Sequence, residues 1–114
     1  MGKNAQLITG YSPAAGNLGS IGDNTRNELV SVDATSKIVA DVNPRICYSI
    51  VNSSLGGQYI TINLGFSQAI VNEGIVLSPG QSWVESNAEN YLCYQGSITA
   101  ISSAAGGQIS IFER

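Results

Sequence analysis

The sequence contains no histidine, and charged residues make up only 11% of its 114 residues. Without histidine, neither a Ser-His-Asp nor a Cys-His catalytic arrangement can be built, and the commonest transition-metal ligand is missing. The eight carboxylates are scattered along the chain and do not suggest the paired acid and base of a glycosidase. We therefore expect a protein that is not an enzyme and that binds neither a metal nor a cofactor.

Positively charged residues are also few. The chain has five cations and eight carboxylates, and the cations form no basic stripe. Such a chain displaces few counterions from phosphates, so we expect no nucleic-acid partner. No apolar run approaches the ~18 residues that span a bilayer, and no secretory segment follows Met1. The expectation is a soluble protein that is made in the host cytoplasm and has no membrane partner.

Cysteine occurs only twice, as Cys47 and Cys93, and not in a C-x-x-C pattern. Both fall in expected strands, so a disulfide is possible if those strands pair. Without a signal peptide, two buried thiols are the favoured alternative.

Glycine, serine and amide residues dominate what remains, and their distribution divides the chain. Residues 1–27 contain five glycines and no apolar period, which predicts an extended arm. Residues 28–114 carry the patterned segments of one domain. Within the arm, Leu7, Ile8 and Tyr11 are the candidate partner-binding residues, because apolar anchors between flexible glycines suit a segment that follows another protein's surface.

The domain alternates with the period of β-strands, and turn residues recur at intervals of about ten residues. This pattern predicts an all-β antiparallel sandwich or barrel. Residues 28–42 should form two short strands joined by residues 33–36. The remaining segments suggest three hairpins, formed by residues 45–52 with 59–64, 74–78 with 81–86, and 91–102 with 108–113.

The middle hairpin has the clearest turn, because Pro79 presets φ at the first central position and Gly80 supplies the positive φ of a type II turn. A two-residue loop here would set Val76 opposite Trp83. We therefore expect Trp83 to be buried in the sandwich or in a subunit contact, and to serve stability.

The order of these segments carries a resemblance over residues 45–114. The segments that carry it are Arg45-x-x-Tyr48-x-Ile50-x-Asn52, Ile60-Thr-Ile62-Asn-Leu-Gly65, Ala69, Gly74-Ile-Val-Leu77-Ser-Pro79-Gly80-Gln-Ser-Trp83, Tyr94-x-Gly96-Ser-Ile98-Thr-Ala100-Ile101-Ser and Gln108-Ile-Ser-Ile111-Phe-Glu113. Their succession resembles small tailed-bacteriophage virion proteins, the accessory capsid proteins described as decoration, cement or head-fibre proteins.

The resemblance implies a β-sandwich or jelly-roll module, built with an extended N-terminal arm, that binds and stabilises the outside of an icosahedral capsid. Its implied partners are the major capsid protein and two further copies in a homotrimer, and its implied location is the virion. The family sets no catalytic residues. The alternative is a receptor- or carbohydrate-binding module of a phage head or tail fibre, with sugar stacking on Tyr59, Trp83, Tyr91 and Tyr94.

Overall fold

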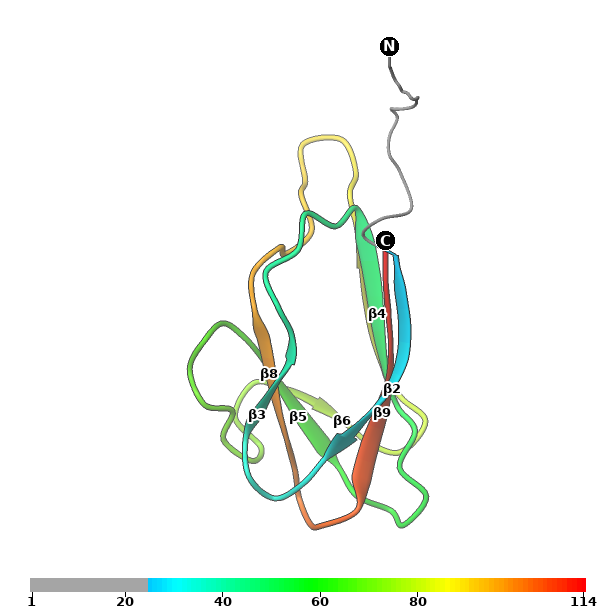
Figure 1. The fold of residues 1–114 in the computed structure, drawn as a ribbon, viewed down its shortest axis with the longest axis vertical. Coiled ribbons are helices and arrows are strands. Elements are labelled where there is room, and N and C mark those ends of the chain that lie inside the picture. The colour runs from blue at the N-terminus through cyan, green and yellow to red at the C-terminus, as the bar shows by residue number, and fades with distance from the viewer. Residues whose placement is uncertain (1–24) are drawn as a thin grey trace.

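The computed structural model describes residues 25–114, and they form strands, turns and loops without a helix (Figure 1). No helix in this part of the chain is long and apolar enough to cross a membrane. The expected all-β class is confirmed. The strands are β2 (Arg26–Val32), β3 (Lys37–Ala40), β4 (Cys47–Asn52), β5 (Ile60–Leu64), β6 (Ile75–Leu77), β7 (Ser82–Ser86), β8 (Ile98–Ser102) and β9 (Gly107–Glu113).

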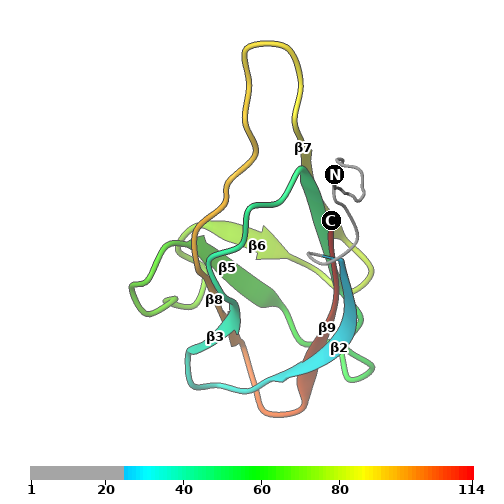
Figure 2. The ribbon, with the colours of Figure 1, turned by 45° about the horizontal axis from the view of Figure 1, so that its top comes forward.

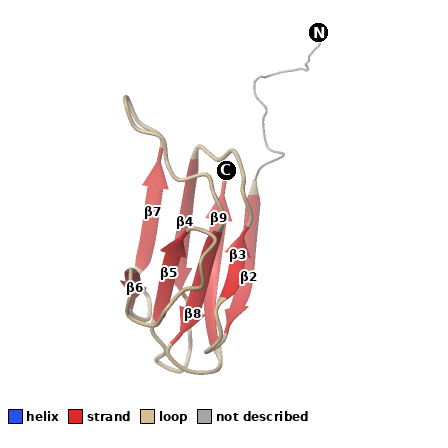
Figure 3. Cartoon of the chain, turned by 90° about the vertical axis from the view of Figure 1, so that its left-hand side faces the viewer, coloured by secondary structure: helices blue, strands red, loops and turns tan. Residues whose placement is uncertain are grey.

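The strands form two antiparallel sheets of four, with the orders β2-β9-β4-β7 and β3-β8-β5-β6 (Figure 3). The pairing is nested: β5 pairs with β6, β4 with β7, β3 with β8 and β2 with β9. These four strand pairs form one long antiparallel ribbon, which folds back on itself so that β9 also pairs with β4 and β8 also pairs with β5. The result is the jelly-roll form of a β-sandwich.

The three expected hairpins are wrong, because the two strands of each one lie in different sheets. Among the strands of residues 25–114, β5 and β6 are the only pair that are both consecutive in the chain and hydrogen-bonded to each other. Trp83 lies opposite Ile50 of β4, and Val76 lies opposite Thr61 of β5. The physical reason is that the same turn residues can connect either two paired strands of a hairpin or two strands that lie in different sheets.

The turn at Pro79-Gly80 is confirmed as a turn and shows how this crossing is made. The Gln81 amide donates to the Ser78 carbonyl at 2.9 Å, and Gly80 has a φ of +85°, as a type II turn requires. The Gly80 amide also donates to the Asn52 carbonyl at 2.8 Å. The end of the turn is therefore bound to β4, and β7 continues in the sheet of β4.

The core lies between the sheets, where alternate residues of each strand point inward. It is composed of Val32, Val39, Ala40, Tyr48, Ile50, Ile60, Ile62, Leu77, Cys93, Ile98, Ala100, Ile109 and Ile111. Trp83 is only partly buried; it packs against this cluster, and its indole N–H donates to the Tyr48 hydroxyl at 2.9 Å. Both cysteines are free thiols as expected, but only Cys93 is buried.

The two outer faces of the sandwich differ. Residues 65–74, which connect β5 to β6, cover the outside of β3-β8-β5-β6. The Thr99 hydroxyl donates to the Ser67 carbonyl at 2.7 Å, and the Asn72 amide donates to the Thr61 hydroxyl at 3.0 Å. Both threonines are buried although they point away from the core. Within residues 25–114, no loop covers the other sheet in this way.

Gly107 lies where two backbones approach closely, because a Cβ built on it would stand 2.7 Å from the carbonyl oxygen of Val32. We expect Gly107→Ala to lower the free energy of unfolding by about 1–3 kcal/mol, since the neighbouring strand must shift. Urea unfolding measures this. Gly65→Ala is the matched control, because its nearest new contact is the Asn63 amide nitrogen at 3.4 Å. Equal stabilities for the two variants would contradict the tight packing at residue 107.

Candidate functional site

Two long connections gather at one end of the sandwich, which we call the loop end: residues 41–46, between β3 and β4, and residues 87–97, between β7 and β8 (Figures 1 and 2). Backbone hydrogen bonds join them, from the Asn43 amide to the Gln95 carbonyl at 3.0 Å and from the Asn87 amide to the Ile46 carbonyl at 2.8 Å. β2 begins and β9 ends at this same end. Residues 1–24 therefore join the described domain here.

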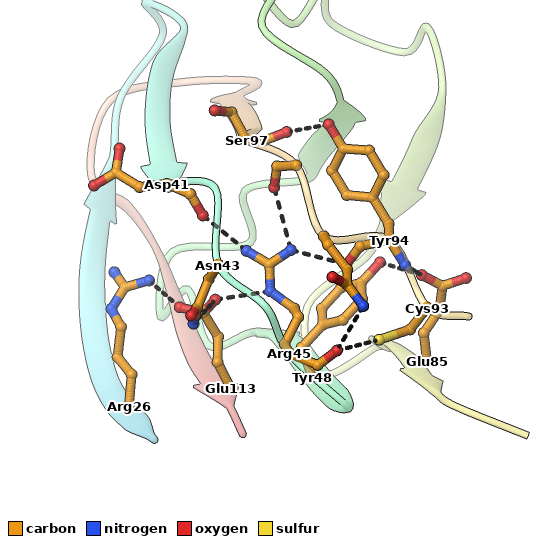
Figure 4. A network of polar contacts seen from close by, with 12 residues as sticks. Arg26, Asp41, Asn43, Arg45, Tyr48, Glu85, Cys93, Tyr94, Ser97 and Glu113 are labelled. Carbon is orange, nitrogen blue, oxygen red and sulfur yellow. Dashed lines mark hydrogen bonds and ion pairs between the residues drawn. The ribbon is translucent and has the colours of Figure 1, made fainter. Parts of the chain in front are cut away.

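Arg45 holds the two connections together from inside. It is fully buried, and its guanidinium donates to the carbonyl oxygens of Asp41 (2.9 Å), Tyr94 (2.8 Å) and Gly96 (3.2 Å) (Figure 4). Its Nε donates to the Glu113 carboxylate at 2.8 Å. A buried cation needs such partners, because leaving water costs it several kcal/mol. Both connections are therefore fixed around one side chain.

Glu113 supplies the compensating negative charge. It is 2% exposed, and one carboxylate oxygen accepts from Arg45 and from the Asn43 amide group at 3.2 Å. The other oxygen accepts from Arg26 at 2.7 Å, and Arg26 also donates to the Val39 carbonyl at 2.9 Å. Since Arg26 belongs to one sheet and Val39 to the other, the network also links the two sheets at their edges.

The same contacts set the ionisation of Glu113. Burial alone would raise the pKa of its carboxyl group. Hydrogen bonds from Arg26, Asn43 and Arg45, together with the Arg45 charge, outweigh burial and hold the pKa below its ordinary value. The carboxylate is therefore the form that stabilises the loop end.

A second group of contacts fixes residues 91–94. The Tyr48 hydroxyl donates to the Glu85 carboxylate at 2.7 Å, and the Tyr94 amide donates to the same oxygen at 3.1 Å. The Tyr91 hydroxyl donates to the other Glu85 oxygen. Burial, reinforced by the bond to Glu85, raises the pKa of Tyr48, so its hydroxyl remains a donor. The tip of the β7–β8 connection is thereby tied to β4 and β7.

The fixed connections present apolar side chains to solvent. Leu92 is 73% exposed and Val42 is 65% exposed, and Ile46 and Tyr91 are exposed beside them. Val42 also lines a groove of about 470 Å³, together with Arg26, Glu28, residues 38–41, Asn43 and Glu113. Residues 25–114 hold no group of His, Cys, Asp or Glu that could bind a metal. Two carboxylates, Asp41 and Glu89, are also exposed on these connections. Apolar side chains held on fixed connections make the loop end suited to docking against protein.

The structure does not test the residues expected to bind partners. Leu7, Ile8 and Tyr11 lie outside the described residues. Of the aromatic residues of the alternative hypothesis, Trp83 and Tyr94 pack against the core. Tyr59 and Tyr91 are exposed, but they belong to the β4–β5 and β7–β8 connections, which lie at opposite ends of the sandwich (Figure 1).

Sequence reasoning missed Arg45 and Glu113 as the residues that build the loop end. One signal was present: the alternation expected for residues 108–113 places Glu113 in phase with Ile109 and Ile111, and therefore on the buried face. An inward carboxylate predicts a buried cation as its partner. Nothing in the sequence identifies Arg45 as that cation, because 67 residues separate the two.

Comparisons of the chain with family models, with curated proteins and with solved structures find no match. The geometry of the described residues and the sequence pattern therefore carry the functional argument.

Replacing Glu113 by glutamine tests the network. Glu113→Gln leaves Arg45 buried without its anion, so we expect the free energy of unfolding at pH 7 to fall by about 3–5 kcal/mol. Because the pKa of Glu113 is lowered by folding, the stability it confers is complete above about pH 4.3 and is lost as pH falls through the lower folded value. Urea unfolding at pH 7 and in acid should show the difference between wild type and variant shrinking in acid.

The control for this prediction is Glu73→Gln, which makes the same change at an exposed glutamate. It should leave the free energy of unfolding nearly unchanged at both pH values. A variant at residue 113 that is as stable as this control would show that the ion network contributes nothing to the fold.

Proposed function

We propose that the chain is a structural virion protein that binds and stabilises the outer surface of a bacteriophage capsid. The observation that carries the proposal is the loop end, where the Arg45–Glu113 network holds apolar side chains rigidly at the point where residues 1–24 join the domain. A docking surface and a long connected segment at one end suit a protein that grips a larger assembly.

Rigidity supports this role because binding costs less when loops are already ordered. Ordering a flexible residue costs about 1–2 kcal/mol of conformational entropy. The contacts of Arg45 order both connections already during folding, so binding does not incur this cost again. Burying Leu92 and Val42 against a partner then contributes apolar contact at about 25 cal/mol per Å². Each copy therefore needs only a modest contact area on a capsid subunit.

Residues 1–24 supply the second contact in this proposal, through Leu7, Ile8 and Tyr11. An extended chain of this length spans at most about 80 Å, which reaches beyond one small domain. Two linked contacts reinforce each other, because the first raises the effective concentration of the second. The major capsid protein is the proposed partner, and a homotrimer is the proposed assembly on the shell.

The jelly-roll topology is compatible with this role, since viral capsid proteins and lectins both use it. The order of motifs in residues 45–114, which resembles phage accessory capsid proteins, favours the capsid. The carbohydrate-binding alternative would need aromatic rings on one surface. In residues 25–114, Trp83 and Tyr94 pack against the core, and Tyr59 lies at the opposite end of the sandwich from Tyr91, so the exposed rings form no common platform.

The test uses heads assembled from the major capsid protein encoded in the same genome. Leu92→Asp and Val42→Asp place charge on the loop end, and we expect each to lower the occupancy of heads by about tenfold, because a contact then buries an unpaired carboxylate. Co-sedimentation of the full chain with heads measures occupancy. Leu55→Asp is the matched control, because Leu55 is 93% exposed and lies in the β4–β5 connection, at the other end of the sandwich.

Cryo-EM of decorated heads tests the assembly and the contact together. Density at three-fold positions, with the loop end facing the shell, is the expected result. No binding of wild type to heads would remove the proposal. Binding to a glycan array, reduced by substitution of Tyr59 or Tyr91, would favour the receptor-binding module instead.

A further inference from the structure

The outward surface of β2-β9-β4-β7, which we call the open face, carries no charged side chain within its strands; one cation, Arg114, lies at its margin, where its backbone pairs with Cys47. The alternation of these strands assigns to it Asn27, Leu29, Ser31, Cys47, Ser49, Val51, Ser82, Val84, Ser86, Gln108, Ser110 and Phe112. Leu29 and Val84 are each 62% exposed. A solvated sheet face of a monomer normally carries charged residues, so this composition indicates a surface that is covered in use.

The strand register places large apolar and small polar side chains of the open face in alternating positions. One row across the sheet is Asn27, Phe112, Ser49 and Val84, and the next is Leu29, Ser110, Val51 and Ser82. Large apolar and small polar side chains therefore alternate both along the strands and across them. Each large side chain therefore lies next to a small one, and the small residues leave low positions in the surface.

Low positions over β2, β9 and β4 form a shallow depression in the face. A hollow of about 330 Å³ lies around Ser49 and Ser110, and its walls include Leu29, Val51 and Phe112. The one charged residue that lines it is Glu28 on the edge strand, whose carboxylate is paired with Arg26 at 2.6 Å. The hollow is open to a side chain the size of those that surround it.

We propose that the open face binds the open face of a second copy of this chain, around a two-fold axis. A surface that carries both a hollow and the apolar side chains that fill it is complementary to itself, which is the condition for an isologous contact. The chain has a net charge of −3, and the uncharged open face lets two copies meet without like charges in the contact.

A second copy fits these observations better than a different protein. Interfaces between different proteins obtain orientation and partner choice from complementary charges. The strands of the open face offer none, so a partner would be selected by the alternation of apolar and small polar side chains, which a second copy carries as well. The proposal does not depend on capsid binding, which uses the loop end.

The size of the face sets the strength of the contact. Four strands about 4.8 Å apart and five residues long give about 300 Å² per copy, compared with the ~800 Å² per partner of a standard stable interface. Pairing should therefore be weak in dilute solution and should become significant where copies are concentrated. Because each contact joins two copies, the species that it forms contain an even number of chains.

Sedimentation velocity on the full chain, from about 10 μM to 1 mM, tests the proposal. Wild type should associate with rising concentration into even-numbered species. Leu29→Asp should weaken this association about hundredfold, because a two-fold contact contains each substitution twice. Leu55→Asp, which places the same charge outside the open face, should associate like wild type. Ser110→Glu, a change at an exposed residue, repeats the test if the first variant is unstable.

Cys47 provides an independent measurement, because it is a partly exposed free thiol on the open face. Its alkylation should slow as wild-type concentration rises, and it should stay fast in Leu29→Asp. Wild type that remains monomeric at the highest concentration, or Leu29→Asp that associates as wild type does, would overturn the proposal. If Leu29→Asp associates normally but no longer binds heads, the open face contacts the capsid and the pairing proposal is wrong.

Discussion

The burial of one carboxylate constrains everything at the loop end. Glu113 lies on the inward face of a central strand, so its charge must be balanced inside the protein. Arg45 is the only fully buried cation in residues 25–114, and once it is placed its remaining N–H groups need carbonyl oxygens. Those oxygens come from both connections of the loop end. Local loop structure thus follows from a charge on another strand.

The low charge of the chain can be related to three surfaces of the domain: the two outer sheet faces and the loop end. A loop covers one sheet, the strands of the other sheet turn no charged side chain outward, and the loop end holds exposed apolar side chains on fixed connections. Of the charged groups in the described part, Arg45 and Glu113 lie inside the protein and stabilise the loop end. Such a distribution is compatible with the proposed contacts with other protein chains.

Sequence patterns predicted which residues form strands better than they predicted which strands pair. Alternation located β4, β5, β7 and β9 closely, because inward and outward positions differ in polarity. Pairing failed because the turn at Pro79-Gly80 has the local chemistry of a hairpin, whereas the partners are decided by contacts between distant strands. The Arg45–Glu113 pair was hidden for the same reason. Residues 91–97, expected as strand, are loop because Glu85 and Arg45 bind their backbone.

The nested order of strand pairing also determines when the fold can form during synthesis. β9 is the last of the described strands to leave the ribosome, yet it lies between β2 and β4, the first and third to emerge. Until β9 arrives, β2 has no neighbour in its sheet and Arg45 has no carboxylate partner. Contacts of such long sequence separation make folding slow. A nascent chain must therefore keep its first strands apart from other chains until nearly all of the domain has been made, and crowded synthesis of many copies is where misassembly would begin.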